Sequence, residues 1–370
     1  MQSEITHTFA AGPHGRFASA YRVLTEAITE QAFPGCAFGV VAGGEIVLSD
    51  AMGHFTYEQD ASAVGSETVY DVASLTKVAS TTAAAMLLYQ RGRLDLNTPL
   101  GELLPGIVVG RAVGDLARHV TLRHLLAHNS GLPGYVQLFR TASTPTALLH
   151  ACLELPLEAE PGTRAEYSDP GFILLGKALE VLLGEELPIW VHREVYEPLG
   201  LAATGFCPPA AMRPSIPPTE EDLTFRKRRI QGEVQDENAW VLGGASGHAG
   251  LFSNVPDLLR FAQEMVEAGS GAGSPRLFDA ETVGLFAQRQ GPEGSSRALG
   301  WDTPSTTSSS GSYFSQRSIG HLGFSGCSLW IDLEARVAVA LLTNRTWPDR
   351  QCQLIRTVRP AFHNAIRQAL

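Results

Sequence analysis

Two segments near opposite ends of the chain carry the hydrophobic pattern of β-strands. Residues 36–50 read CAFGVVAGGEIVLSD, where two apolar runs flank Gly43-Gly44, a pair typical of a two-residue hairpin turn. Residues 328–344, SLWIDLEARVAVALLTN, predict two further strands. Both ends of the chain are therefore expected to contribute to one sheet.

Helical patterns occupy the middle of the chain and both flanks of the strands. The central helices are predicted at residues 76–91, 121–128, 145–154, 170–183 and 187–196. An amphipathic segment at 16–33 precedes the first strand, and a helix at 352–370 closes the chain. This order predicts an α/β (α+β) fold, in which a domain of residues 1–75 and 241–370 carries a mostly helical domain, 76–240, with the active site between them.

Composition excludes several classes of partner. The 370 residues include 28 basic and 38 acidic side chains, and the net charge of -10 argues against nucleic acid. The one basic run, RKRR at 226–229, is interpreted as a solvated or substrate-facing patch. No apolar stretch approaches the ~18 residues of a membrane span. The start, MQSEITHTFAAGPHG, lacks the basic and apolar regions of a signal peptide, so a complete natural chain is expected to be cytoplasmic, and a truncated one periplasmic or secreted.

Metal and cofactor chemistry is not indicated. His124 and His128 have the i, i+4 spacing of zinc ligands, but a zincin requires Glu where this chain has Leu125. Phosphate-binding and dinucleotide-binding glycine motifs are absent, as is the GxSxG of α/β-hydrolases. Five cysteines, odd in number and without a CxxC pair, are typical of reduced thiols.

The segment YDVASLTKVAS, residues 70–80, contains an unusual lysine. Lys77 is one of only three lysines, and it lies in the first turn of a predicted helix, where the helix dipole disfavours a cation. Ser74 lies three residues earlier, on the same helix face. A neutral lysine can accept the serine proton, whereas arginine cannot. Lowering a lysine pKa from ~10.4 to near 7 requires roughly 4–5 kcal/mol, most of which burial must supply.

Two downstream segments supply further candidate groups. In EPGTRAEYSDPGFILLG, residues 160–176, Ser168 or Asp169 can cap a helix that starts at Pro170, which leaves Tyr167 on a loop where its phenol could relay a proton. In SIGHLGFSGCSLW, residues 318–330, a strand leads into a glycine-rich bend whose backbone N–H groups could face a developing oxyanion.

Ser-x-x-Lys, Tyr-Ser-Asp and His-Leu-Gly, in this order, resemble the motifs of the serine β-lactamase and penicillin-binding-protein superfamily. The likeness is greatest to class C β-lactamases and their esterase-like relatives. It extends from about Tyr21 to Asn344 and includes LRHLLAHNSGLPG at 122–134. It implies a β-lactamase/transpeptidase-like antiparallel sheet flanked by helices, with an inserted helical domain and an acyl-enzyme mechanism.

The resemblance also implies roles for individual residues. Ser74 would be the nucleophile, Lys77 its base and Tyr167 the proton relay. The backbone N–H groups of Ser74 and Phe324 would form the oxyanion hole. The remaining motif residues would bind substrate: His321, Gly323 and Asp169.

Two motifs depart from the superfamily's usual form. Asp169 stands where Asn is usual, and an ionised carboxylate cannot donate to a substrate carbonyl and favours a charged Lys77. His-Leu-Gly stands where Lys-Thr-Gly is frequent, so Leu322 removes a hydroxyl and His321 replaces a permanent cation with a group that titrates near neutrality. Both changes predict weak activity on carboxylate-bearing lactams.

Residues 216–252 resemble a subgroup that includes muropeptide-recycling amidases. Four polar residues there could line a substrate cleft or belong to a structural loop: Arg226, Asp236, Asn238 and His248.

Together these features predict a serine hydrolase that acts on an ester or amide through an acyl-serine intermediate, without a metal or cofactor. The expected partner is a small-molecule ester, an amide or a cell-wall fragment. Two alternatives stay open: a muropeptide amidase or D-peptide hydrolase, and a weakly catalytic penicillin-binding or sensor protein.

Overall fold

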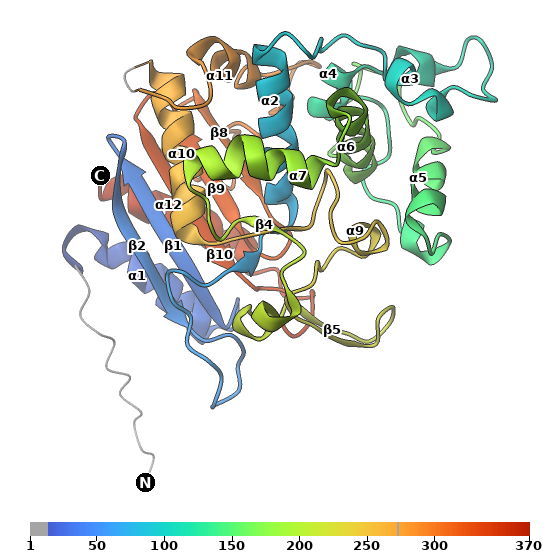
Figure 1. Ribbon diagram of the computed structural model, residues 1–370. Helices are drawn as coiled ribbons and strands as arrows, with labels where there is room; N and C mark the ends of the chain where they lie inside the picture. Colours follow the sequence, from blue (N-terminus) through green and yellow to red (C-terminus); the bar gives the residue numbers. More distant parts are fainter. Residues whose placement is uncertain (1–13, 272–273) are drawn as a thin grey trace.

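A five-stranded antiparallel sheet forms the centre of the computed structural model, which describes residues 14–271 and 274–370. Its strand order is β2-β1-β10-β9-β8, so strands from the two ends of the chain lie side by side (Figure 1). The strands are β1 (Gly35–Ala42), β2 (Glu45–Gly53), β8 (Ser318–Leu322), β9 (Ser328–Asp332) and β10 (Val337–Thr343). The predicted hairpin at Gly43-Gly44 and the sheet shared by both ends are confirmed.

Helices cover both faces of this sheet. On one face, α1 (His14–Thr29) and α12 (Ile355–Gln368) pack together, and Phe17, Phe38 and Phe362 share their hydrophobic cluster. On the other face, α10 (Val255–Ser270) crosses β1, β9 and β10 (Figure 1). The sheet is therefore buried between two helical layers.

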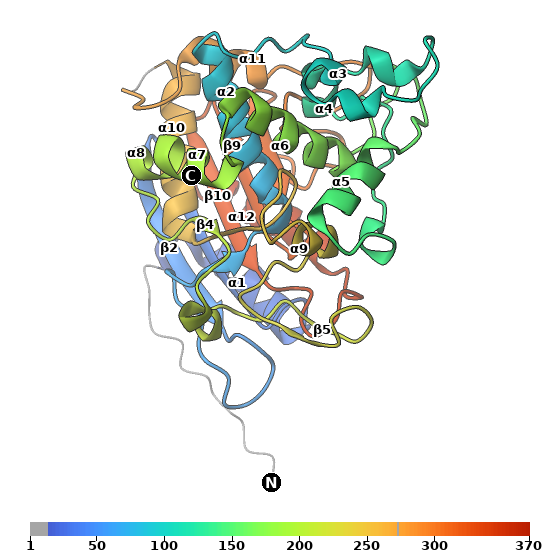
Figure 2. The same ribbon diagram turned by 45° about the vertical axis from the view of Figure 1, so that its right-hand side comes forward.

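The helical middle of the chain gathers beside the α10 face of the sheet (Figure 2). Its main helices are α2 (Ala83–Gln90), α3 (Leu100–Leu103), α4 (Leu122–Leu126), α5 (Pro145–Leu153), α6 (Asp169–Leu183), α7 (Leu187–Val191), α8 (Glu197–Leu199) and α9 (Glu237–Val241), with α11 (Ala280–Phe286) following α10. The five predicted central helices are present, although 187–196 changes from α7 into π-helical turns at His192–Tyr196. The domain limits 1–75, 76–240 and 241–370 stay a prediction, since one hydrophobic cluster runs from the sheet into these helices.

The segment around Lys77 differs from the regular helix expected there. A 3₁₀ turn at Ala73–Leu75 is followed by π-helical turns at Lys77–Thr82, and only then does α2 begin. All six residues of the π-helical part are buried. Such wide turns often occur at functional sites.

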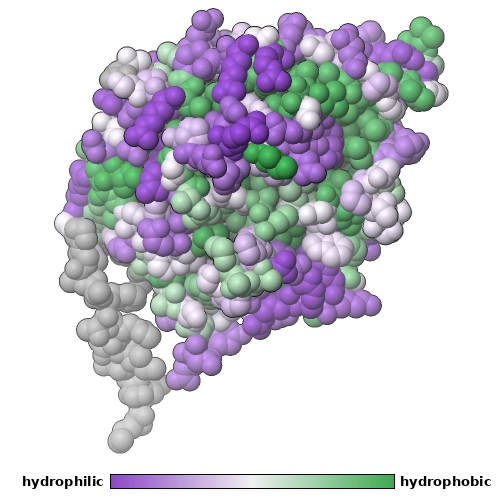
Figure 3. Space-filling model, viewed as in Figure 1, coloured by the Kyte–Doolittle hydropathy of each residue, from purple (hydrophilic) through white to green (hydrophobic). Residues whose placement is uncertain are grey.

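Two smaller sheets complete the described fold. Strand β3 (Tyr70–Asp71) pairs with β7 (Leu251–Ser253), which also pairs with β4 (Gly205–Phe206). The hairpin of β5 (Glu220–Asp222) and β6 (Arg228–Ile230) carries a hydrophilic surface (Figure 3). Its exposed arginines are paired, Arg228 with Glu233 and Arg229 with Glu221, so this part of the basic run is a solvated patch.

The described residues also bear on cysteine pairing, membrane-span length and metal-ligand clusters. All five cysteines are free, and Cys36, Cys152 and Cys327 are buried. Within 14–271 and 274–370, none of the helices has the length and apolar content that a bilayer span requires, and no cluster of three His, Cys, Asp or Glu is arranged to hold a metal. Most of MQSEITHTFAAGPHG, the N-terminal segment without a signal-peptide pattern, lies outside the described residues.

Candidate active site

Ser74 lies on the floor of a cleft, directly after a residue with unusual backbone geometry. Ala73 has a φ of +48°, which side-chain-bearing residues seldom adopt. The buried Asp71 carboxylate holds this turn, because its Oδ1 accepts from the Ala73 N–H at 2.8 Å. Its Oδ2 accepts from the Gln235 N–H at 2.7 Å. Asp71 thus joins the turn that carries Ser74 to the loop that carries Gln235.

Three acceptors surround the ammonium group of Lys77, which is fully buried. Its Nζ lies 2.7 Å from Asp169 Oδ1, 3.0 Å from the His248 carbonyl oxygen and 3.2 Å from Ser74 Oγ. An ammonium group has three N–H donors, so each finds one acceptor. The structure therefore brings Ser74, Lys77 and Asp169 together as the motifs predicted.

The charge state of Lys77 differs from the one that burial alone would give. Burial lowers the pKa of Lys77, but the Asp169 carboxylate and, to a smaller extent, Tyr167 raise it, and the net pKa is raised. The expectation that burial brings this lysine close to a neutral amine is therefore wrong for the free protein, whereas the prediction that Asp169 favours a charged Lys77 is confirmed. Lys77 rests as a cation and must lose a proton before it can accept one.

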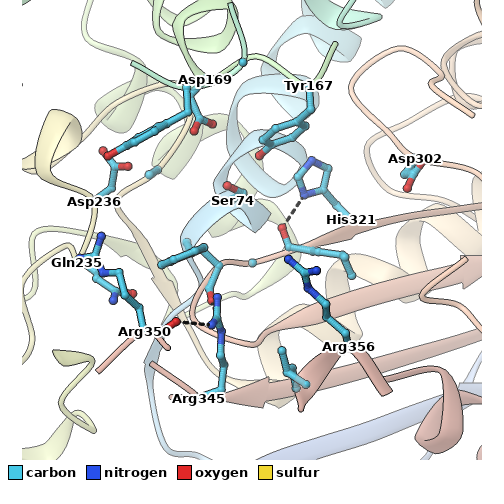
Figure 4. Close-up of a pocket in the computed structure, with 18 of the residues that line it drawn as sticks. Ser74, Tyr167, Asp169, Gln235, Asp236, Asp302, His321, Arg345, Arg350 and Arg356 are labelled. Atoms are coloured by element: carbon cyan, nitrogen blue, oxygen red, sulfur yellow. Dashed lines mark hydrogen bonds between the residues drawn. The ribbon is translucent and has the colours of Figure 1, made fainter. Parts of the chain in front are cut away.

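Tyr167 lies beside this pair because of how α6 begins. Ser168 is the N-cap residue of α6: its Oγ accepts from the Gly171 N–H at 3.0 Å and donates to the Pro133 carbonyl at 2.7 Å. Lys77 Nζ lies 4.8 Å from the centroid of the Tyr167 ring. The phenol points toward Ser74 (Figure 4). Burial raises the pKa of Tyr167, while the charge of Lys77 opposes that rise, so the hydroxyl is protonated at neutral pH.

The third motif forms the opposite wall, where β8 ends. A Cβ on Gly323 would lie 2.4 Å from the Val72 carbonyl oxygen, so only glycine allows the bend to approach the strand that leads to Ser74. The Gly323 N–H donates to the carbonyl oxygen of Cys327 at 2.7 Å. The buried guanidinium of Arg359 donates to the carbonyl oxygens of Gly323 and Cys327. Phe324 follows on the cleft wall with 48% of its surface exposed.

His321 is neutral, contrary to the expectation that it titrates near neutrality. Burial and the cations of Lys77 and Arg297 hold its pKa well below the usual value. Its Nδ1 lies 2.9 Å from the Leu322 carbonyl, which can only accept, so Nδ1 carries the proton (Figure 4). The third motif therefore supplies no cation to the cleft.

The four candidates from residues 216–252 divide into two groups. Asp236 lines the cleft, and its Oδ1 lies 2.9 Å from His248 Nε2. Burial raises the pKa of Asp236, but the charge and hydrogen bond of His248, the Ala239 N–H and the charge of Lys77 together lower it to about 2. The hypothesis that His248 lines the cleft is corrected, because its side chain is buried outside the lining and only its carbonyl oxygen reaches the site, where it accepts from Lys77.

Arg226 and Asn238 are structural residues, and the hypothesis that they line the cleft is corrected. Arg226 is nearly fully buried and bonds Asp222 and the carbonyls of Val234 and Gln235. Asn238 is fully buried, accepts from the Phe139 N–H and donates to the Val136 carbonyl. Arg226 satisfies backbone groups of its own loop, and Asn238 satisfies backbone groups of Val136 and Phe139, so neither side chain faces substrate.

The cleft between these walls has a volume of about 750 Å³. Its lining includes charged residues that no motif indicated: Glu166, Glu237, Arg297, Asp302, Arg345, Arg350 and Arg356. Figure 4 labels four of them: Asp302, Arg345, Arg350 and Arg356. Glu166 directly precedes Tyr167 and Glu237 begins α9, whereas the other five come from loops and from α12. Only tertiary contacts bring them to the site.

Comparison with known proteins identifies the family of this chain. The Beta-lactamase family model matches residues 20–359. This chain belongs to the β-lactamase family. A Salmonella typhi protein provisionally named a D-alanyl-D-alanine carboxypeptidase is 31% identical over 349 residues, which cover 85% of this chain and 79% of that protein.

Solved structures share the fold of this β-lactamase-family chain. EstCE1, described as a hydrolase with promiscuous acyltransferase activity, has a TM-score of 0.74 at 22% identity and covers 94% of this chain and 98% of its own. A penicillin-binding protein homologue from Caulobacter crescentus has a TM-score of 0.75 at 18% identity, with coverage of 98% and 99%. The chain is a β-lactamase-family serine hydrolase.

Proposed function

We propose that this serine hydrolase cleaves esters and amides through an acyl-serine intermediate, and that D-peptide fragments of the cell wall are among its substrates. The observation that carries the proposal is the 3.2 Å contact between Lys77 Nζ and Ser74 Oγ at the base of the cleft. The carboxypeptidase name of the 31% identical relative supports the peptide substrates. Esters are expected to react faster than carboxylate-bearing lactams, since Asp169 cannot donate a hydrogen bond to a substrate carbonyl.

The proposed reaction has two acyl-transfer steps. After Lys77 has lost its proton, its amine accepts the proton of Ser74 Oγ, and Oγ bonds to the substrate carbonyl carbon. The backbone N–H groups of Ser74 and Phe324 stabilise the oxyanion. The bond to the leaving group breaks, and the leaving group takes up a proton through Tyr167. Water then attacks the acyl-serine, which releases the acid and restores Ser74.

The experiment combines labelling with turnover. A fluorophosphonate probe is expected to label Ser74, identified by mass spectrometry, and the Ser74→Ala variant should neither bind the probe nor hydrolyse p-nitrophenyl acetate. A panel of p-nitrophenyl esters, a chromogenic cephalosporin and a muramyl peptide then ranks the substrates. Labelling of Ser168 or Ser325 would refute the assignment. An acyl-enzyme that forms on Ser74 without turnover would instead indicate the penicillin-binding or sensor alternative.

A further inference from the structure

His128 is a buried titratable residue that the proposed reaction does not use. It belongs to the segment LRHLLAHNSGLPG and lies two residues after the end of α4, with a φ of +53°. Helices commonly end in this left-handed conformation, but the residue there is usually glycine and sometimes asparagine. The backbone alone therefore does not account for a histidine at this position.

His128 holds the chain on both sides of Tyr167. Its carbonyl oxygen accepts from the Glu166 N–H at 2.7 Å, and its Nδ1 accepts from the Ser168 N–H at 3.0 Å. Glu166 and Ser168 are the residues directly before and after Tyr167. One residue thus fixes the stretch of backbone from which the Tyr167 side chain extends.

The imidazole of His128 also packs against the Tyr167 ring. The two ring centroids are 4.7 Å apart with an angle of 37° between the ring planes. On α6, Phe172 makes a second ring contact with His128, at 4.8 Å and 29°. Close packing resists rotation of the Tyr167 ring, so the phenol stays directed toward Ser74 (Figure 4).

The imidazole of His128 is neutral. Burial, followed by the cations of Arg297 and Lys77, holds the pKa of His128 well below its usual value. Because Nδ1 accepts a hydrogen bond, the single ring proton is on Nε2. Within the described residues this buried Nε2 has no hydrogen-bond partner, and an unpaired buried donor costs free energy. The chain retains the imidazole in spite of that cost.

Only histidine supplies both kinds of contact at this position. Asparagine tolerates the left-handed backbone and can accept a hydrogen bond but has no ring, and phenylalanine has a ring but no acceptor. We propose that His128 is a positioning residue that keeps the phenol of Tyr167 aligned with the leaving group, so that it sets the rate on esters and amides whose leaving groups need a proton. This inference rests on the proposed function, in which Tyr167 protonates the leaving group.

The test compares three acetate esters that form the same acetyl-enzyme and differ only in the leaving group. p-Nitrophenolate departs as a stable anion, phenolate departs less readily, and ethoxide needs a proton as it departs. We measure kcat/KM for p-nitrophenyl, phenyl and ethyl acetate in wild type, His128→Asn, His128→Phe and Tyr167→Phe. The control is His150→Asn, because His150 is an exposed histidine on α5 outside the cleft lining.

The expected result is a loss that depends on the leaving group. Both His128 variants should lose about ten- to a hundredfold in kcat/KM for ethyl acetate, the order expected when a catalytic group is slightly displaced. Their kcat/KM for p-nitrophenyl acetate should change little, and phenyl acetate should fall in between. Tyr167→Phe should show the same selectivity with a larger loss, up to the ~10²–10⁴-fold that a general acid contributes. His150→Asn should match wild type on all three esters.

Two outcomes would overturn the proposal. An equal loss on all three acetates in the His128 variants would mean that His128 supports the whole site and does not act through Tyr167. Wild-type rates on all three would mean that the phenol stays in place without the imidazole. If both His128 variants fail to fold, Phe172→Leu decides, since it leaves both hydrogen bonds of His128 in place and removes a ring that packs on it. A Phe172→Leu protein without a selective loss on ethyl acetate would likewise overturn the proposal.

Failure of the proposed function gives a different result. If wild type hydrolyses none of the acetates and a fluorophosphonate does not label Ser74, the hydrolase proposal fails, and the role of His128 fails with it. If Tyr167→Phe loses activity equally on all three esters, Tyr167 is not the donor to the leaving group, and the inference falls for that reason. If Tyr167→Phe is selective and the His128 variants are not, only the inference about His128 is wrong.

Discussion

The carboxylate of Asp169 lies 2.7 Å from the ammonium group of Lys77, and the contact joins two residues that are 92 positions apart. This ion pair holds the candidate base in its charged form, because a nearby anion stabilises the protonated amine. Activity should therefore increase with pH above neutrality, as Lys77 loses its proton.

Asp169→Asn removes that anion, so the pKa of Lys77 should fall. We expect the pH at which kcat/KM for p-nitrophenyl acetate reaches half its maximum to move toward acid. The restored amide can donate to a substrate carbonyl, so hydrolysis of a cephalosporin should also improve. The pH dependence of kcat/KM for p-nitrophenyl acetate and for the cephalosporin measures both changes. Thermal unfolding is the stability control. An unchanged profile would show that Asp169 does not set the charge state of Lys77.

Lys77→Arg should abolish ester hydrolysis. Arginine keeps the positive charge but cannot accept a proton near neutral pH, and loss of a general base costs at least ~10²-fold in rate. The matched control is Lys177→Arg, since Lys177 also pairs with a carboxylate, Glu180 at 2.7 Å, but lies outside the cleft. The control should retain wild-type kcat. A fully active Lys77→Arg protein with an unchanged far-UV spectrum would rule out Lys77 as the base.

Gly323→Ala should lower both kcat and the melting temperature. The new Cβ would lie 2.4 Å from the Val72 carbonyl oxygen, so the bend must move away from the segment that leads to Ser74. Gly284→Ala on α11 is the control, because its Cβ would meet no atom within 4 Å. There, alanine should leave turnover unchanged and stabilise the helix slightly. Equal behaviour of the two variants would contradict the close approach at Gly323.

Asp71 should make stability depend on pH. Burial raises the pKa of Asp71 from 3.8 to about 6, so the folded protein retains this proton to a higher pH than the unfolded chain does. Stability from this group is therefore lost as pH rises from about 4 to 6, by on the order of 3 kcal/mol. We expect the free energy of unfolding of wild type to fall relative to Asp71→Asn between pH 4.5 and 7, as measured by urea unfolding. Parallel curves would show that Asp71 ionises alike in both states.

The sequence by itself determined most of the secondary structure and the three candidate motifs, although the π-helical turns at Lys77–Thr82 were not predicted. The Gly43-Gly44 hairpin, the helix that starts after Ser168 and the strand that carries His321 depend on local periodicity and turn chemistry, which short segments encode. The Ser74 and Lys77 pair could be predicted because residues three apart share a face of almost any helical turn.

Only the tertiary structure decided the charges in the cleft and the composition of its walls. Lys77 is a cation because Asp169 lies against it, and His321 is neutral because burial and two remote cations act on it. Arg297 reaches the site through bridges to the edge of β8, whereas Arg226 turns away to bind backbone carbonyls. Desolvation and Coulomb energies depend on distances between residues far apart in the chain, and no local pattern in the sequence contains those distances.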